Sequence, residues 1–475
     1  MDFSKIKKIY MIGIKGVGMT MLAQYFSARG FAVSGSDIRE KFMTDEILTK
    51  SGIKVFEKFS KKNIPCDADL IIYSTAYNAD NNKEVALALA GKIKTLTYAQ
   101  ALAEVFNQKH GIAIIGSHGK TTITAWLGYV LWRAGLDPNV MVGAKVPQFD
   151  GATLVGKSNY LIIEADEYQN KLKYFQPKGV ILNNIDYDHP DFFPTKQDYE
   201  NVFKKFIKKI PFEGFLVANF DDLAIRKIVA SHKGKIITYA IEHAADYVAY
   251  DLRVKNGKQY FKIQPPLHHL VSGENMDFSI QLLGRHNITN ALAVIATNVE
   301  LGVDLFKIKK FLTEFSGTTR RLQVLGEFNG AIIIDDYAHH PTEIKASLSA
   351  LRQKYNKRKM IVIFHPHTFT RTKIFLNDFA KSFDQADEVL ILDIYGSARE
   401  KQGGVNSKDL VNKVKSEKLK VNANPEDVKY LPTLADCEKY LRIHISRDDV
   451  VVLMGAGDVF RIGENLVNKT VTTLS

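Results

Sequence analysis

The sequence predicts an α/β protein with largely parallel sheets and more than one domain. Short apolar runs alternate with segments of helical periodicity over most of the chain, which is typical of strands that are joined by helices. The chain has 475 residues. Because hydrophobic cores stop growing at about 250–300 residues, we expect two to four domains.

The composition argues against a membrane protein, a secreted disulfide-rich protein and a nucleic-acid binder. No apolar run reaches the ~18–20 residues of a membrane helix, so we expect no membrane insertion, and the N-terminus lacks the features of a signal peptide. Cys66 and Cys437 match no metal or redox spacing, which favours a reducing cytoplasm. The net charge of +12 comes from residues spread along the chain, as on a solvated basic surface. The sequence predicts no oligomeric state.

A dinucleotide-type glycine loop follows the first expected strand, at residues 8–12. Lys15 replaces the middle glycine of the usual fingerprint, and Asp37 ends the second strand, where a ribose hydroxyl is usually bound. Ser74 and Thr75 follow a later strand. The residues of the loop that we single out are Gly13, Lys15, Gly16, Gly18 and Met19.

A second glycine loop is the strongest local signal for phosphate binding. Residues 116–122, Gly-Ser-His-Gly-Lys-Thr-Thr, follow an expected strand at 112–115 and open a helix. Backbone N–H groups in such a loop point at a phosphate, and the helix N-terminus adds positive potential. Lys120 then lies near the β- and γ-phosphates, and the hydroxyl of Thr121 can bind Mg²⁺. Because Ile114 stands where the standard spacing has glycine, the loop is a shortened variant.

Acidic and histidine-containing segments follow two further expected strands, at residues 161–163 and 180–182. Ligands bind at the carboxyl ends of strands in α/β sheets. Glu164 is therefore the natural Mg²⁺ ligand to face Thr121. A neutral His189 can bind a second Mg²⁺ or orient a phosphoryl oxygen.

The remainder of the chain adds a small antiparallel sheet, expected between residues 247 and 283, and a third α/β block. We place the block boundaries near residues 106 and 317. Paired arginines at Arg320 and Arg321 suit phosphates or carboxylates, which the guanidinium group binds bidentately. The strands of the third block are expected at 331–334, 360–364, 389–392 and 450–454.

Taken in order, these motifs resemble the Mur ligase family over nearly the whole chain. The motifs that carry the resemblance are GSHGKTT at 116–122, EADE at 164–167, NNIDYDHPD at 183–191, GRHNITNA at 284–291, GTTRR at 317–321, DDYAHHP at 335–341 and HPHTFTRT at 365–372.

The resemblance implies a fold of three domains. Residues 1–106 would form a Rossmann-like domain that binds a UDP-sugar. Residues 107–317 would form a central P-loop ATPase-like domain, with a mostly parallel sheet and a small antiparallel one. Residues 318–475 would form a second Rossmann-like domain that closes over ATP and an amino acid.

The resemblance also implies an activity: ATP-dependent ligation of L-alanine to UDP-N-acetylmuramate through an acyl phosphate, in peptidoglycan synthesis. The implied catalytic residues are Lys120, His189, His339 and Arg371. Two Mg²⁺ ions are implied, with ligands from Thr121, Glu164 and His189. The residues implied to bind ATP are Gly116, Ser117, His118, Gly119, Lys120, Thr121, Thr122, His286, Asn287, Asn290, Arg321 and Asp336. Those implied to bind the sugar nucleotide or the amino acid are Gly13, Lys15, Gly16, Gly18, Met19, Asp37, Ser74, Thr75, Arg320, Tyr337, His339 and Arg371.

Several alternatives remain open at this point. Within the family, a ligase that recycles a tripeptide resembles the chain at residues 164–168, whereas residues 365–372, 393–400 and 455–458 look like the L-alanine-adding members. Outside it, the first glycine loop alone fits a nicotinamide dehydrogenase, although the second phosphate loop speaks against that activity. A nucleic-acid-stimulated ATPase would fit the charge. A UDP-sugar-binding protein without activity requires Lys120 and Glu164 to be idle.

Overall fold

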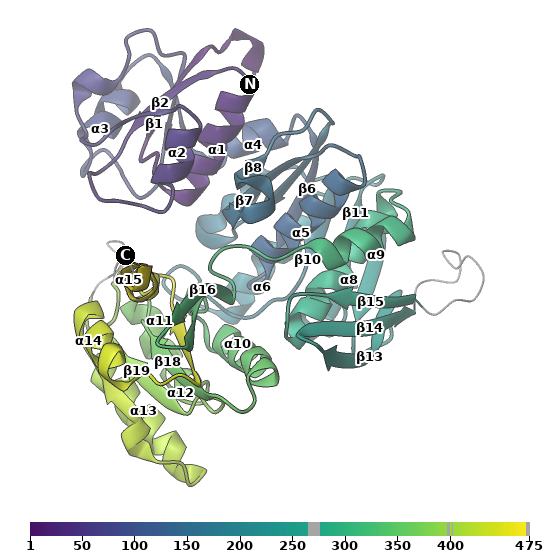
Figure 1. The fold of residues 1–475 in the computed structure, drawn as a ribbon. Coiled ribbons are helices and arrows are strands. Elements are labelled where there is room, and N and C mark those ends of the chain that lie inside the picture. The colour runs from purple at the N-terminus through teal and green to yellow at the C-terminus, as the bar shows by residue number, and fades with distance from the viewer. Residues whose placement is uncertain (265–275, 397–399, 401, 472–475) are drawn as a thin grey trace.

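The computed structural model describes residues 1–264, 276–396, 400 and 402–471. These residues form three α/β domains, each built on its own sheet, which follow one another along the chain (Figure 1). The sheets are mostly parallel, with antiparallel additions at their edges. The predicted fold class is therefore confirmed. Within the described part of the chain, no helix is long and apolar enough to cross a membrane.

The N-terminal domain has a five-stranded parallel sheet of order β3-β2-β1-β4-β5. The strand order reverses direction at the central strand β1, which pairs with β2 on one side and β4 on the other. Ligands bind at such a topological switch point in open α/β sheets. The strands are β1 Lys8–Ile12, β2 Ala32–Ser36, β3 Lys54–Phe56, β4 Leu70–Tyr73 and β5 Lys94–Thr97. The helices are α1 Val17–Ala28, α2 Asp45–Lys50, α3 Lys83–Ala90 and α4 Tyr98–Phe106.

The central domain has a ten-stranded sheet in which β6 lies between β9 and β10, all three parallel. The apolar residues 112–115 of β6 are fully buried, as expected for a strand covered on both faces. The strands are β6 His110–Ile115, β7 Asn139–Val146, β8 Gly151–Leu154, β9 Tyr160–Glu164, β10 Gly179–Leu182, β11 Phe215–Asn219, β12 Lys235–Ala240, β13 Tyr247–Lys255, β14 Lys258–Gln264 and β15 Met276–Ile280. The helices are α5 Lys120–Arg133, α6 Lys196–Ile207, α7 Leu223–Val229, α8 Arg285–Glu300 and α9 Leu305–Glu314.

The antiparallel part of the central domain is the strand series β13, β14 and β15, which extends one end of the ten-stranded sheet (Figure 1). It matches the expectation for residues 247–283, of which 265–275 lie outside the described residues. The amphipathic helix α6 begins at Lys196, where Thr195 caps it by accepting a hydrogen bond from the backbone N–H of Asp198. Its buried face includes Tyr199 and Phe203.

The C-terminal domain has a six-stranded sheet of order β16-β17-β21-β18-β19-β20. Only the edge strand β16 is antiparallel. None of its residues is fully buried, so its apolar pattern was too weak to predict it. The strands are β16 Gln323–Phe328, β17 Ala331–Asp336, β18 Lys359–Phe364, β19 Glu388–Ile391, β20 Val428–Tyr430 and β21 Asp449–Met454. The helices are α10 Pro341–Lys354, α11 Phe369–Ile374, α12 Leu376–Ala380, α13 Ser407–Lys420, α14 Leu434–His444 and α15 Phe460–Val471.

The domain boundaries at residues 106 and 317 stay predictions. Helix α4 of the first sheet ends at Phe106, and the first strand of the third sheet begins at Gln323. The C-terminal domain contacts both of the others. Phe375 packs against Tyr187 of the central domain, and the Arg461 guanidinium donates a hydrogen bond to the Lys41 carbonyl of the N-terminal domain.

Candidate active site

The glycine loop at residues 116–119 connects β6 to α5 and is held by the loop after β10. Gly116 and Gly119 have φ of +128° and +81°. A Cβ on either would come within 2.8 Å of Asn183 or Asn184, so both positions require glycine. The backbone N–H of His118 donates to Asn184 Oδ1 at 2.7 Å. The side chain of Ser117 is hydrogen-bonded to the backbone of Asp186 and to the Tyr199 hydroxyl. The loop therefore places a helix N-terminus at the edge of the sheet, as a phosphate site requires.

Lys120 is the first residue of α5, and its ammonium lies inside the loop. Its Nζ donates to the Gly116 carbonyl at 2.5 Å and to Glu167 Oε2 at 2.9 Å. Burial alone would lower the pKa of Lys120, but the carboxylates of Glu167, Asp166 and Glu164 raise it above its ordinary value. The ammonium is thus charged and sits beside the predicted phosphate position.

Thr121 and Glu164 lie together, as the sequence predicted for two ligands of one metal. The Thr121 hydroxyl donates to Glu164 Oε2 at 2.8 Å. The other carboxylate oxygen, Oε1, is buried against Gly143 and accepts no hydrogen bond of normal geometry. Burial raises the pKa of Glu164, opposed by the Thr121 hydroxyl and Lys120. A hydroxyl and a carboxylate oxygen without a partner are suitable ligands for Mg²⁺, so these residues fit that ion.

His189 follows β10 and lies with the last two residues of Glu-Ala-Asp-Glu. A nitrogen of His189 and carboxylate oxygens of Asp166 and Glu167 all lie within 4.8 Å of one another. His189 has a positive φ of 54°, and its ring stands 4.6 Å from that of Tyr168. The structure thus brings His189 to the side of Lys120 that Glu167 occupies. Its role as a metal ligand stays a prediction.

A cavity of about 870 Å³ opens between the central and C-terminal domains. Its lining residues include His118 and Gly119 of the glycine loop and residues of helix α10. Other residues predicted to bind ATP that line it are Thr122, His286, Asn287, Asn290, Arg321 and Asp336. Asn290 joins the loops through hydrogen bonds with Asn183 and Asn287, each of 3.1 Å. This cavity is where the geometry favours the nucleotide.

Two buried groups of the cavity have unusual protonation. Burial lowers the pKa of His286 to about 4, with Arg321 adding to the effect. Burial raises the pKa of Asp336 to about 6, against the opposing effects of Ser347 and Arg321. One oxygen of Asp336 has no hydrogen-bond partner. An unpartnered carboxylate in a cavity is suited to accept hydrogen bonds from ligand hydroxyls.

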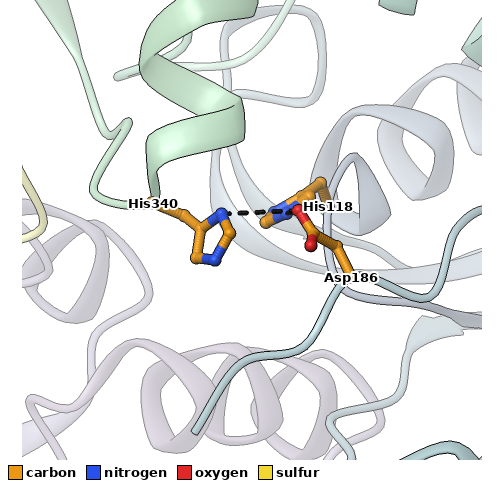
Figure 2. A group of neighbouring side chains, drawn as sticks. All are labelled: His118, Asp186 and His340. Carbon is orange, nitrogen blue, oxygen red and sulfur yellow. Dashed lines mark hydrogen bonds and ion pairs between the residues drawn. The ribbon is translucent and has the colours of Figure 1, made fainter. Parts of the chain in front are cut away.

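The C-terminal domain is joined to the central domain by one buried ion pair and by a cluster of histidine and aspartate side chains. The Arg371 guanidinium donates through Nε and Nη2 to Asp188 Oδ1, at 3.0 and 2.9 Å. Arg371 is 4% exposed, so in this structure its guanidinium is paired with Asp188 and does not point into an open cavity. His118, Asp186 and His340 form a second cluster across the same junction (Figure 2). These contacts hold the loop after β10 against the loops of the C-terminal domain.

The other predicted residues of the C-terminal domain have structural partners. The Arg320 guanidinium lies between the rings of Tyr337 and Phe460, at 5.0 and 4.8 Å from their centroids. It also donates to the Gly455 carbonyl at 2.7 Å. His339 contacts the Tyr337 carbonyl through Nδ1, and burial lowers its pKa to about 4. Of the predicted segment 393–400, residues 397–399 lie outside the described residues.

The glycine loop of the N-terminal domain is built around Asp37. One Asp37 oxygen accepts the backbone N–H of Lys15 at 2.7 Å, and burial raises the pKa of this carboxyl. The Lys15 ammonium contacts Asp45 and Glu57, so acidic side chains of its own domain hold it. Met19 is buried in the hydrophobic core, which leaves only its backbone for a ligand.

The N-terminal loop adjoins the acidic segment of the central domain through Tyr98. A Cβ on Gly18 would lie 2.7 Å from the Tyr98 ring, and burial together with Glu164 and Asp166 raises the Tyr98 pKa. Gly16 lies in the turn before α1, with its N–H donating to the Gly13 carbonyl. Ser74 faces Gly13, and Thr75 lines a small cavity beside Tyr98. The predicted sugar-nucleotide and metal sites are therefore neighbours.

Sequence reasoning assigned no role to four acidic residues that hold the cations of the site: Glu167, Asp186, Asp188 and Glu343. Three of them stand inside the motifs that we quoted, and Glu343 lies two residues after the last residue of Asp-Asp-Tyr-Ala-His-His-Pro. Their partners are distant in sequence; Asp188 and Arg371 are 183 residues apart. The motifs contained three of these acidic residues, but the sequence did not indicate which basic residues they contact in the fold.

Comparison with known families agrees with this geometry. Three family models match in series: "Mur ligase family, catalytic domain" at residues 8–110, "Mur ligase middle domain" at 114–298, and "Mur ligase, glutamate ligase domain" at 320–457. A UDP-N-acetylmuramate–L-alanine ligase of Alkaliphilus metalliredigens is 38% identical over 470 residues, 98% of each chain. The chain belongs to the Mur ligase family.

Other Mur ligases share the full length of the chain. The UDP-N-acetylmuramate–L-alanine ligase of Desulfosudis oleivorans is 36% identical, with 98% of this chain and 99% of that one covered. Among solved structures, the UDP-N-acetylmuramate-alanine ligase of Thermotoga maritima is 26% identical with a TM-score of 0.81, covering 98% and 99% of the chains. A murein peptide ligase from Psychrobacter arcticus has a TM-score of 0.73 at 24% identity, which shows the shared fold.

The raised pKa of Asp336 generates a prediction about stability. A buried Asp whose pKa is about 6 in the folded protein costs stability once it ionises, so the free energy of unfolding falls as pH rises from about 4 to 6. Asp336→Asn removes this charge. We expect it to stabilise the protein at pH 7.5, by on the order of 2 kcal/mol, and much less at pH 4.5. Thermal unfolding at both pH values measures this, and an equal shift at the two contradicts it.

Proposed function

We propose that this Mur ligase joins L-alanine to the lactyl carboxylate of UDP-N-acetylmuramate, with release of ADP and phosphate, in peptidoglycan synthesis. The observation that carries the proposal is the convergence of three loops after β6, β9 and β10. They bring Lys120, Thr121, Glu164 and His189 to one edge of the sheet, next to a cavity that fits a nucleotide. The full-length relatives supply the identity of the substrates.

The chemistry requires two anions to meet. The lactyl carboxylate attacks the γ-phosphorus of ATP, ADP leaves, and an acyl phosphate forms. The amine of L-alanine then attacks the acyl carbon, and phosphate leaves as the amide bond forms. Two unit charges ~4 Å apart interact by about 4 kcal/mol at an effective dielectric of ~20, so positive charge at the meeting point lowers the barrier. Lys120 is the charged group of this chain that is best placed to do so.

Mg²⁺ would be held by Thr121 and Glu164, and a second ion by His189, with Asp166 and Glu167 beside it. When bound, such ions neutralise phosphate oxygens and orient the reacting groups. The unpartnered oxygen of Glu164 supports the first position. The cluster around His189 supports the second, although an acidic cluster of this kind also serves to orient Lys120.

We assign the sugar nucleotide to the N-terminal loop and the amino acid to the C-terminal domain. The backbone of residues 13–18, together with Asp37, Ser74 and Thr75, surrounds the switch point of the first sheet. His339 and Arg371 lie at the junction with the central domain. Because burial lowers the pKa of His339 to about 4, its imidazole is neutral at pH 7 but a weak base, so we assign it to contact with the amino acid and not to removal of the proton from the attacking amine. These roles are consistent with an enzyme of the cytoplasm, where both substrates and ATP occur together.

The tripeptide-recycling ligase is not favoured over L-alanine addition. Several full-length relatives at 35–38% identity carry the L-alanine ligase name, whereas the murein peptide ligase structure is a likeness of fold alone. The test is phosphate release from ATP with UDP-N-acetylmuramate and a panel of L-alanine, glycine, L-serine and the tripeptide. We expect L-alanine to give the highest kcat/KM. Release that requires the tripeptide, or that needs no sugar nucleotide, contradicts the proposal.

Loss of the loop ammonium tests the phosphate role. We expect Lys120→Ala to lower kcat by about 10²-fold or more, because it removes a fixed charge from the reacting phosphate. Binding of UDP-N-acetylmuramate, measured by calorimetry, should change little, since that ligand occupies the N-terminal loop. Lys255→Ala, at an exposed lysine of β13, is the matched control. A Lys120→Ala enzyme with normal turnover would refute the assignment.

Replacement of the histidine tests the second metal position. His189→Ala should raise the Mg²⁺ concentration needed for half-maximal activity by at least about tenfold. The measurement is a Mg²⁺ titration at saturating substrates. His444→Ala, at an exposed histidine of α14, serves as control. If the two titrations coincide with that of the unchanged enzyme, His189 does not hold a metal.

A further inference from the structure

Glu343 is a carboxylate in the wall of the cavity that fits the nucleotide. It lies in the first turn of α10, and only 11% of its side chain is exposed. A buried negative charge is unexpected here, since it repels the phosphates of a bound nucleotide. The proposed function gives it no role. Its position therefore requires an explanation from the groups around it.

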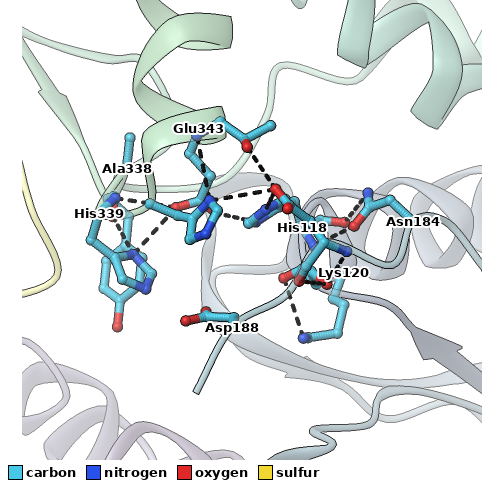
Figure 3. Close-up of polar contacts among 12 residues, drawn as sticks. His118, Lys120, Asn184, Asp188, Ala338, His339 and Glu343 are labelled. Atoms are coloured by element: carbon cyan, nitrogen blue, oxygen red, sulfur yellow. Dashed lines mark hydrogen bonds and ion pairs between the residues drawn. The ribbon is translucent and has the colours of Figure 1, made fainter. Parts of the chain in front are cut away.

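Three basic side chains surround this carboxylate, and they come from different parts of the chain; Figure 3 shows two of them, His118 and His339. His118 of the phosphate loop lies with Nδ1 3.2 Å from Oε1. Arg321, which begins the C-terminal region, lies with Nη1 3.6 Å from the same oxygen. His339 lies with Nδ1 3.3 Å from Oε2 and also donates its backbone N–H to Oε2 at 3.1 Å. All three are residues that we assign to ATP or to the amino acid.

We propose that Glu343 is a positioning residue that keeps His118 of the phosphate loop charged, beside the nucleotide, while the C-terminal domain is docked. This inference rests on the proposed nucleotide site and extends it. His118 and Glu343 belong to different domains, so their contact exists only when the domains meet. Docking then adds a second carboxylate to the imidazole of the phosphate loop, which raises its pKa further next to the bound nucleotide.

The surroundings of His118 support a charged ring. Its Nε2 contacts Asp186 at 3.0 Å, so each ring nitrogen faces a carboxylate and both can carry a proton. Burial opposes the charge, but Asp186 and Glu343 together raise the pKa of His118 to about 9. The other titratable groups that face it are His340, whose ring lies 4.8 Å away, and His286. Burial and His118 lower the pKa of His340, and burial lowers that of His286.

The effect of burial on the Glu343 carboxylate is likewise offset by neighbouring groups of opposite charge. Burial alone would raise its pKa, but His339, His118 and Arg321 hold it well below the ordinary value. A group that stays ionised can keep a neighbouring imidazole ionised over the whole physiological range. Asp186 does this from within the central domain, and Glu343 adds its effect from the other side of the junction. Removal of Glu343 therefore lowers the pKa of His118 without abolishing its contact with Asp186.

The test uses Glu343→Gln, which keeps the shape of the side chain and removes its charge. The binding of ADP with Mg²⁺ is measured by calorimetry between pH 6.5 and 8.5, with the full chain. At pH 6.5, where His118 stays protonated in both proteins, we expect the variant to bind ADP within about threefold of the unchanged protein. At pH 8.5 we expect the variant to bind at least about fivefold more weakly. Glu327→Gln, at an exposed glutamate of β16, should match the unchanged protein at every pH.

Different outcomes separate this role from others. An equal loss of affinity at all pH values indicates a structural role and overturns the proposal. Tighter binding of ADP at all pH values means that Glu343 only repels the nucleotide, and also overturns it. The titration of the His118 ring by NMR in the full chain, assigned with His118→Gln, gives a second readout. We expect the His118 pKa to fall by at least one unit in Glu343→Gln, and an unchanged pKa contradicts the proposal.

Neither measurement depends on ligation. If the unchanged protein releases no phosphate with UDP-N-acetylmuramate and L-alanine, the proposed function fails, but the effect of Glu343 on ADP binding can still be measured. If ligation proceeds and the pH dependence of ADP binding is the same in both proteins, the inference about Glu343 fails alone.

Discussion

Three basic side chains of this active site each lie beside a carboxylate, and the arrangement of the site depends on that pairing. A single charge taken out of water is costly unless an opposite charge accompanies it. Lys120 is paired with Glu167, and Arg371 with Asp188. His118 is shared between Asp186 and Glu343. The protein can thus concentrate positive charge where anionic substrates bind and still remain folded before they arrive.

The topology of the central sheet explains why these pairs form where they do. Strand β6 lies between β9 and β10, and all three run in the same direction. The glycine loop, the acidic segment after β9 and the histidine segment after β10 therefore emerge at one edge. The C-terminal domain contributes the remaining partners through Arg371 and helix α10. Two of the pairs cross between domains, so the same interactions that neutralise the site also hold the domains together.

The sequence predicted what depends on local pattern. The fold class and the family are confirmed, because strand, loop and helix signals lie close together around residues 112–122 and recur along the chain. Thr121 and Glu164 also lie together, since both follow parallel neighbouring strands. The roles of the site residues stay predictions, but their convergence on one edge is what the motifs led us to expect.

The partners of the charged residues could not be predicted in this way. No local pattern tells that Arg371 meets Asp188, or that Glu343 meets His118 from another domain. Lys15 shows the same limit. It occupies a phosphate-loop position, yet its ammonium is held by Asp45 and Glu57. Edge strand β16 was missed because none of its residues is fully buried and the strand carries little apolar signal. Long-range pairing depends on the folded structure rather than on neighbouring residues.

The central claim is that this gathered charge lets a carboxylate attack a phosphate. An isotope experiment tests it most directly, with UDP-N-acetylmuramate carrying ¹⁸O in both oxygens of its lactyl carboxylate. With ATP and L-alanine, one labelled oxygen should appear in each phosphate released, because the carboxylate oxygen leaves with the phosphoryl group. Phosphate without ¹⁸O, formed together with the ligated product, would contradict this account.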